Sequence, residues 1–161
     1  MSNHHPPAQP PLGQSAAYPD DYDPGLLFAI PRAEQRARLG ITGTLPFFGM
    51  DTWNAYEMSW LNLRGKPQVG IATLQVPADS PNIVESKSMK LYMNSLNQLR
   101  TAGADAVQSL LQADLSAAFG APVQVLLSTS DSFGQTLMGE LEGLLLDRLD
   151  IEVDGYQPNP A

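Results

Sequence analysis

Three charged side chains close together in the sequence have the types and spacing of an anion-binding site. The segment ESKSMK contains Glu85, Lys87 and Lys90, and two of the chain's three lysines lie in it. The apolar residues that follow recur at helical spacing, so both lysines are expected in the first turn of a helix, where the helix dipole disfavours cations. The free backbone N–H groups of a helix N-terminus attract anions. This placement favours an external anion as the partner of the two ammonium groups.

Each of these residues also has a purely structural interpretation. A carboxylate at the position of Glu85 can cap the helix by accepting hydrogen bonds from free backbone N–H groups. Ser86 and Ser88 could act as caps as well. Lys87 and Lys90 are three positions apart and share a helix face, where they could simply be solvated and paired with Glu85. The spacing alone leaves both interpretations open.

A β-hairpin is predicted before this helix. Tyr56, Met58 and Trp60 recur at every second position, which is the period of a strand. The RGKP sequence at residues 64–67 has the chemistry of a turn that reverses the chain. Residues 69–74 alternate in the same way and predict the second strand. The hairpin therefore precedes the charged segment in the fold.

Two helices and further extended segments are predicted after the hairpin. An amphipathic stripe at helical spacing covers residues 89–99, and a second covers residues 107–119 and ends at Gly120. Residues 122–130 are expected to be extended, and residues 138–157 extended or irregular. The order β-β-α-α-β-β predicts an α+β fold, with an antiparallel sheet and two helices packed on one face.

Residues 1–40 are expected to form a tail and an arm outside the globular part. Residues 1–24 contain many prolines and show no periodicity. The arm that follows carries three arginines and is interrupted by Pro31 and Gly40, which predicts irregular structure rather than a core element. The folded module is expected in residues 41–157.

The composition argues against several classes of function. A net charge of −8 disfavours nucleic-acid binding, which needs clustered cations. No apolar run approaches about 18 residues, so no membrane span is expected. The N-terminus lacks the features of a secretory signal and the chain has no cysteine, which together fit a cytoplasmic protein. The only histidines, His4 and His5, lie in the tail, so no metal site is expected.

The sequence ESKSMKLYMNS resembles the signature of the QueF family, the nitrile reductases of queuosine biosynthesis, a pathway of tRNA modification. The stretches LPFFGMDTWNAYEMSWLNLRGKPQV and LYMNSLNQLR resemble the amino-terminal module of the two-module form of these enzymes. The resemblance extends from about Tyr22 to Tyr156. It implies a tunnelling fold (T-fold), whose module order is β-β-α-α-β-β. It also implies a homo-oligomer, because sheets of this fold usually associate edge to edge.

The resemblance further implies a reaction and roles for individual residues. The family reduces 7-cyano-7-deazaguanine to the 7-aminomethyl compound with two NADPH; a cysteine attacks the nitrile carbon to form a thioimide, and an aspartate is the proton donor. By this resemblance Glu85 would bind the purine-like edge of the substrate, since two parallel N–H groups suit a carboxylate. Ser86 would donate a hydrogen bond to the substrate or to a phosphate. Lys87 and Lys90 would hold the phosphates of NADPH.

No catalytic residue is expected in this chain, because it contains no cysteine. In the two-module form the cysteine and the aspartate belong to a carboxy-terminal catalytic module, which the resemblance implies as a partner. Without a thiolate no thioimide can form, so the 161 residues alone are expected to be inactive. The alternative is a non-catalytic T-fold domain that retains the purine pocket. A pterin-pathway T-fold enzyme is disfavoured, because it would need a His/Cys zinc site.

Overall fold

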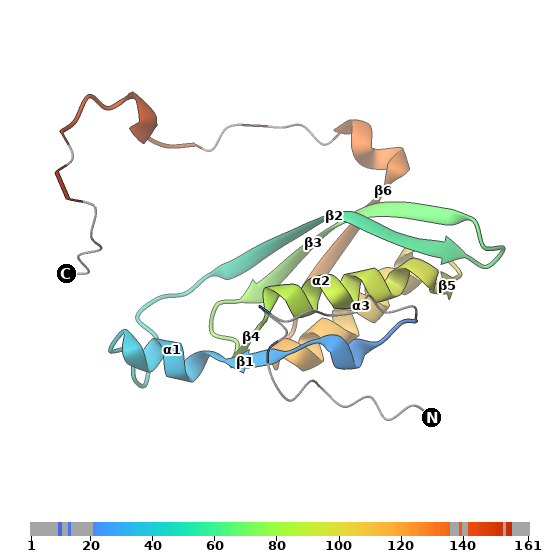
Figure 1. The fold of residues 1–161 in the computed structure, drawn as a ribbon, viewed down its shortest axis with the longest axis horizontal. Coiled ribbons are helices and arrows are strands. Elements are labelled where there is room, and N and C mark those ends of the chain that lie inside the picture. The colour runs from blue at the N-terminus through green and yellow to red at the C-terminus, as the bar shows by residue number, and fades with distance from the viewer. Residues whose placement is uncertain are drawn as a thin grey trace.

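The main sheet of the protein has four strands. The computed structural model describes residues 10, 13, 21–135, 139, 142–152 and 154–155. Within them, the sheet has the strand order β5-β2-β3-β6 (Figure 1). β6 (Gln124–Thr129) pairs antiparallel with β3, whereas the short β5 (Arg100–Thr101) pairs parallel with β2. The sheet is therefore mixed, with antiparallel pairing predominant.

The predicted hairpin is confirmed. β2 (Met50–Asn62) and β3 (Pro67–Pro77) pair antiparallel and are joined by the turn that the RGKP sequence predicts. Within the turn, the side-chain Oδ1 of Asn62 accepts hydrogen bonds from the backbone N–H groups of Arg64 and Lys66, each at 2.9 Å. Gly65 adopts a φ of 84°, in the left-handed region that favours glycine. These local interactions fix the position at which the chain reverses.

Both predicted helices are present and cover one face of the sheet. α2 (Ser86–Ser95) continues into the 3-10 turn η2 (Leu96–Gln98), and α3 (Ala104–Phe119) runs alongside (Figure 1). α3 ends where Gly120 takes a φ of 69° and donates its backbone N–H to the carbonyl of Ser116. The layering of helices against a sheet makes this an α+β fold.

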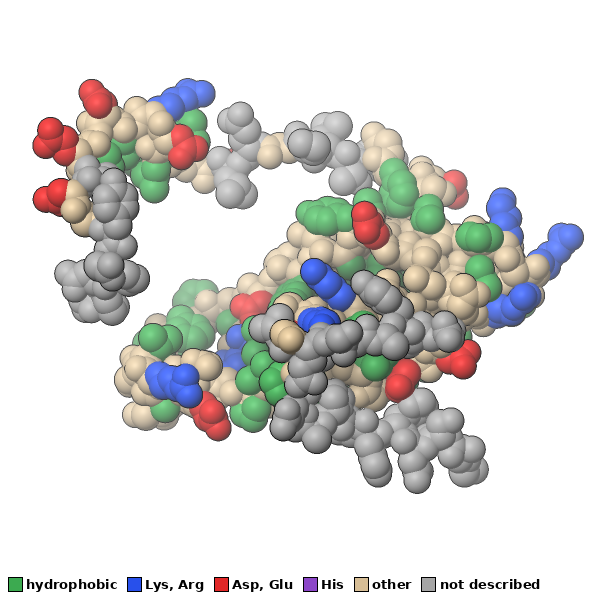
Figure 2. Space-filling view, in the orientation of Figure 1, with side chains coloured by type: hydrophobic (Ala, Val, Ile, Leu, Met, Phe, Trp, Pro, Cys, Tyr) green, Lys and Arg blue, Asp and Glu red, His purple; other side chains and the backbone are tan. Residues whose placement is uncertain are grey.

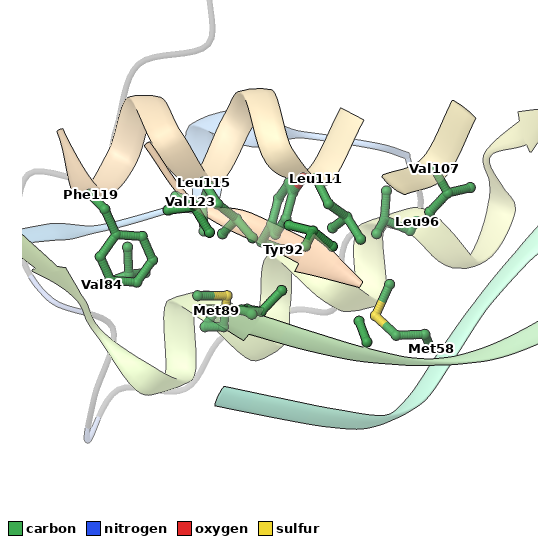
Figure 3. Packing of buried hydrophobic residues seen from close by; sticks show 14 of the residues in the cluster. Met58, Val84, Met89, Tyr92, Leu96, Val107, Leu111, Leu115, Phe119 and Val123 are labelled. Carbon is green, nitrogen blue, oxygen red and sulfur yellow. The ribbon is translucent and has the colours of Figure 1, made fainter. Parts of the chain in front are cut away.

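The hydrophobic core lies between the two helices and the sheet. Most of its members come from the inward faces of α2 and α3 and from alternate positions of β2, β3 and β6, and each member is at most 6% exposed (Figure 3). They include Met58, Trp60, Leu74, Val76, Met89, Tyr92, Leu96, Val107, Leu111, Leu115, Phe119 and Val125. Burial of this apolar surface holds α2 at a fixed position against β2.

The arm before the sheet is regular, so the prediction of irregular structure there is wrong. It contains the 3-10 turn η1 (Pro24–Leu26), the strand β1 (Ala29–Pro31) and the helix α1 (Arg32–Arg38). β1 pairs antiparallel with β4 (Asn82–Val84), and Leu27 is only 6% exposed and belongs to the core. A three-residue strand has no detectable period and depends on a distant partner, which is why the sequence pattern missed it. The division of the chain at residue 40 stays a prediction.

The last predicted strand is not found in the described part of the C-terminal segment. β6 is followed by the 3-10 helix η3 (Ser130–Gln135), and residues 142–152 contain only the 3-10 turn η4 (Leu146–Arg148). In Figure 1 this segment leads away from the sheet, so its described backbone has no neighbouring strand to pair with. Residues 138, 140–141, 153 and 156–157 of the predicted stretch lie outside the described residues.

The helices of the described part of the chain are short or amphipathic. The longest, α3, has 16 residues, and no helix in these ranges is long and apolar enough to cross a membrane.

Candidate functional site

Glu85 caps the N-terminus of α2. It follows β4 directly, keeps an extended backbone (φ −65°, ψ 135°), and is only 6% exposed. Its Oε1 accepts a hydrogen bond from the backbone N–H of Lys87 and its Oε2 one from that of Ser88, both at 2.8 Å. The capping interpretation of Glu85 is therefore confirmed. Oε1 also accepts a long hydrogen bond from the Ser86 hydroxyl, at 3.5 Å, whereas Oε2 retains one acceptor site among the described residues.

The backbone around Glu85 is fixed from the N-terminal arm. The N–H of Glu85 donates to the carbonyl of Phe28 at 2.9 Å. Ser88, which is fully buried, donates its hydroxyl to the carbonyl of Glu85 at 2.7 Å and accepts from the N–H of Phe28 at 3.1 Å. The start of α2 is thus held by the arm on one side and by its own cap on the other.

A groove of about 560 Å³ lies between β2 and α2. One wall comes from β2, the other from one face of α2, and the floor is apolar. The lining residues are Trp53, Asn54, Ala55, Tyr56, Glu57 and Met58 of β2, Leu74 of β3, and Ser86, Met89, Lys90, Met93 and Asn94 of α2. Basic side chains lie over α2 in the space-filling view (Figure 2).

The structure brings two of the four predicted site residues into this groove. Ser86 and Lys90 are both exposed and are four positions apart, so they share the helix face that lines it. Glu85 is buried at the helix end, and Lys87 is half-buried and absent from the groove lining. Lys87 follows Ser86 by one residue, which turns its side chain about 100° around the helix.

Glu57 and Tyr56 are groove residues that the sequence reasoning missed. The predicted alternation placed Tyr56 on the same strand face as Met58 and Trp60, and this is wrong for Tyr56. Met58 and Trp60 are each 2% exposed, whereas Tyr56 is 69% exposed. The pairing of β2 with β3 shifts between Ala55 and Met58, which is a β-bulge. An extra residue in a strand leaves no mark in the apolar pattern, so the sequence offered no sign of it.

The groove combines cationic, polar and apolar surfaces. Lys90 contributes an ammonium group and Ser86 a hydroxyl, above a floor that includes Trp53 and Met89. Such a surface can hold a phosphorylated ligand that also carries a flat apolar ring. Among the described residues, no group of three His, Cys, Asp or Glu side chains is placed to hold a metal ion.

Comparison with known proteins identifies the family. A family model described as "Nitrile reductase, 7-cyano-7-deazaguanine-reductase N-term" matches residues 18–127, which include both walls of the groove. The chain belongs to this family. The family membership expected from ESKSMK is therefore confirmed, and the matched range covers all four predicted site residues.

Curated relatives in this nitrile reductase family are longer than the chain. A protein of Ralstonia nicotianae is 58% identical over 157 residues, which is 96% of this chain and 57% of that protein. A protein of Cupriavidus metallidurans is 59% identical over 157 residues, with the same coverage. One of Bordetella parapertussis is 59% identical over 150 residues, or 93% and 55% of the two chains. All three are named NADPH-dependent 7-cyano-7-deazaguanine reductase, and the chain spans a little more than half of their length.

Proposed function

We propose that this chain is the amino-terminal module of an NADPH-dependent nitrile reductase that converts 7-cyano-7-deazaguanine to 7-aminomethyl-7-deazaguanine in queuosine biosynthesis. The family membership and the names of the relatives support the reaction. The observation that carries the proposal is the position of Lys90 and Ser86 at the N-terminal end of α2, in a groove large enough for part of a dinucleotide. The chain supplies binding groups, and the nucleophile comes from another polypeptide segment, because this chain has no cysteine.

Lys87 and Lys90 are proposed to bind the phosphates of NADPH. The residues present fit this cofactor, since Lys90 offers a cation at the groove and the apolar floor offers a surface for its rings. Lys87 lies at the same end of α2, and its long flexible side chain can extend toward a phosphate at the helix N-terminus. When bound, NADPH supplies hydride to the substrate. The chain's own residues bind it and hold it in one orientation.

Glu85 and Ser86 are proposed to bind the deazaguanine ring. The Glu85 carboxylate is held by two backbone N–H groups, so its remaining lone pairs have a fixed direction. A carboxylate fixed in this way suits the two parallel N–H groups of a guanine-type edge. Ser86 is exposed beside it, and its hydroxyl, which donates to Oε1 of Glu85 at 3.5 Å, would donate to the ligand instead. Because Glu85 is only 6% exposed, the ligand would reach its carboxylate through the small part of the side chain that is accessible.

The module is further proposed to be a T-fold that assembles into a homo-oligomer in the cytoplasm. The hairpin, the two helices on one face and the extended β6 match five of the six elements of that module order. β5 and β6 are the outer strands of the described sheet, and unpaired strand edges favour association. The proposed partner in catalysis is the carboxy-terminal catalytic module, with its cysteine and aspartate.

The experiment that tests this function combines the chain with the cysteine-bearing carboxy-terminal half of a relative. We expect NADPH oxidation that depends on 7-cyano-7-deazaguanine only when both parts are present, and none from the 161 residues alone. Turnover by the chain alone would contradict the proposal. Binding of the deazaguanine without turnover in the combination, where the intact relative is active, would favour the alternative of a purine-binding domain without catalytic activity.

A further inference from the structure

The pairing of β1 with β4 ends in a hydrogen-bond bridge through Ser88. Ala29 pairs with Val84, so Phe28 and Glu85 face each other at the next position of the antiparallel pair. The N–H of Glu85 donates directly to the carbonyl of Phe28, at 2.9 Å. The reciprocal bond of such a pair is replaced by two bonds. The N–H of Phe28 donates to Oγ of Ser88 at 3.1 Å, and the hydroxyl of Ser88 donates to the carbonyl of Glu85 at 2.7 Å. Ser88 therefore joins the end of the strand pairing to the start of α2.

Ser88 also contacts the carboxylate of Glu85. Its backbone N–H donates to Oε2 at 2.8 Å, so one residue binds both the carbonyl and the carboxylate of Glu85. Ser88 is fully buried. Without its hydroxyl, the N–H of Phe28 would lose this partner, which is unfavourable for a donor shielded from water. Glu85 would then be held to the arm by one hydrogen bond instead of two.

Ser95 makes the same pair of bonds farther along α2. Its hydroxyl donates to the carbonyl of Tyr92 at 2.7 Å and accepts from the N–H of Asp23 at 3.2 Å. Like Ser88, it is almost completely buried and bonds to a carbonyl three residues earlier. It follows Ser88 by seven residues, so it lies on the same helix face about 10 Å farther along the axis. The two serines attach the arm to α2 at two points, and only the first point includes Glu85.

We propose that Ser88 is a positioning residue for the Glu85 carboxylate and thereby for the deazaguanine ring. This inference rests on the proposed function of Glu85. A contact between a carboxylate and two parallel N–H groups depends on the direction of the carboxylate. That direction follows from the backbone of Glu85 and from its cap, and Ser88 bonds to both. Ser95 attaches the arm with the same chemistry but bonds to neither.

The test compares Ser88→Ala with Ser95→Ala in the chain combined with the cysteine-bearing carboxy-terminal half of a relative. Each change removes a hydroxyl that makes two hydrogen bonds, so urea unfolding should show a similar loss of stability in both variants. Calorimetry follows under conditions in which both are folded. Ser88→Ala should weaken 7-cyano-7-deazaguanine binding by about tenfold, the effect of losing one hydrogen bond to a charged group, and Ser95→Ala should leave it unchanged. NADPH binding should be unchanged in both variants.

A second pair of variants serves if Ser88→Ala does not fold. Ser88→Cys and Ser95→Cys nearly keep the size of the side chain, but a thiol forms only weak hydrogen bonds. The same difference in deazaguanine binding is expected between them.

Glu85→Gln in the same assay separates the role of Ser88 from that of Glu85. If Glu85→Gln weakens deazaguanine binding and Ser88→Ala weakens it more than Ser95→Ala, the inference is supported. If Glu85→Gln weakens it but the two serine variants bind equally well, or Ser88→Ala weakens both ligands by the same factor, the role of Ser88 is refuted and Glu85 remains the proposed contact. If Glu85→Gln has no effect, the proposed role of Glu85 is refuted and the role of Ser88 with it.

Discussion

At the scale of single residues, the carboxylate of Glu85 has a structural role and a proposed binding role. It caps α2 through both oxygens, and the proposed function asks the same oxygens to meet the substrate. These demands are compatible, because the cap uses one lone pair of each oxygen and the Ser86 hydroxyl engages the second lone pair of Oε1 only by a long hydrogen bond, at 3.5 Å. The cap also gives the carboxylate a fixed direction, which a free side chain on a helix surface would lack. The helix cap therefore orients the carboxylate for the proposed contact with the substrate.

Glu85→Gln should separate these two roles. Glutamine keeps the shape but replaces one acceptor with an NH₂ group that faces a backbone N–H, so we expect the free energy of unfolding to fall by about 1–2 kcal/mol. Urea unfolding measures this loss. Deazaguanine binding should weaken beyond what the stability change explains, at concentrations where the variant is fully folded. If stability falls and binding does not, Glu85 is only a helix cap.

At the scale of elements, Tyr22, just before η1, is attached to both core helices through one carboxylate. Oδ2 of Asp114 on α3 accepts hydrogen bonds from the hydroxyls of Tyr22, at 2.6 Å, and Tyr92, at 2.7 Å. Burial, the hydrogen bond to Asp114 and its negative charge, in that order, raise the pKa of both tyrosine hydroxyls above their ordinary value. Ionising either hydroxyl in the folded protein would remove a donor and place two negative charges together.

This cluster predicts a loss of stability in alkaline solution. Because the folded-state pKa of Tyr22 and Tyr92 is raised, their contribution is fully present below the unfolded pKa of about 10 and is lost as the pH rises above it. Tyr22→Phe should cost about 1 kcal/mol near pH 8, and the variant should lose less stability than the wild type between about pH 8 and pH 11.

Urea unfolding at both pH values measures this difference. Tyr56→Phe is the matched control, since Tyr56 is 69% exposed and forms no hydrogen bond with the described residues. If the wild type and Tyr22→Phe lose the same free energy of unfolding between the two pH values, the tyrosine hydroxyls do not cause the alkaline loss of stability.

The elements that the sequence predicts well are those that local chemistry specifies. The hairpin follows from alternation and the RGKP turn, and α2 and α3 follow from apolar residues at helical spacing with Gly120 at the end of α3. The arm was missed because the pairing of β1 with β4 joins segments about 50 residues apart, and its short strands have no period. Ser86 and Lys90 line the groove, but their binding roles stay predictions, and the exposure of Tyr56 and Glu57 depends on a bulge that only strand pairing reveals.

At the scale of the whole molecule, no helix of the described residues covers the sheet face opposite α2 and α3. Val69 and Leu126 lie on this side and are 52% and 64% exposed, while their neighbours Gly70 and Val125 are buried against the helices. Figure 1 shows both α2 and α3 on the other side of the sheet. An exposed apolar sheet face next to an unpaired outer strand favours self-association.

We expect the chain to associate through this face or its edge. Leu126→Lys should shift the protein toward the monomer in sedimentation velocity experiments over a range of concentrations. Association through this face would bury the new ammonium group without a partner, which is strongly unfavourable. Ser109→Lys is the control, since Ser109 is exposed on α3 on the opposite side. A chain that sediments as a monomer at every concentration, or the same shift with both variants, would contradict this assembly.

The most direct test of the proposed site is the effect of its lysines on two ligands. Calorimetry would compare NADPH and 7-cyano-7-deazaguanine binding to the chain combined with its cysteine-bearing half, with and without Lys87→Ala and Lys90→Ala together. Lys66→Ala, an exposed lysine in the β2–β3 turn, is the control. We predict that the double change weakens NADPH binding by about 100-fold, roughly tenfold for each phosphate contact, and leaves deazaguanine binding nearly unchanged. Equal weakening of both ligands, or an equal effect of Lys66→Ala, would contradict the phosphate site at α2.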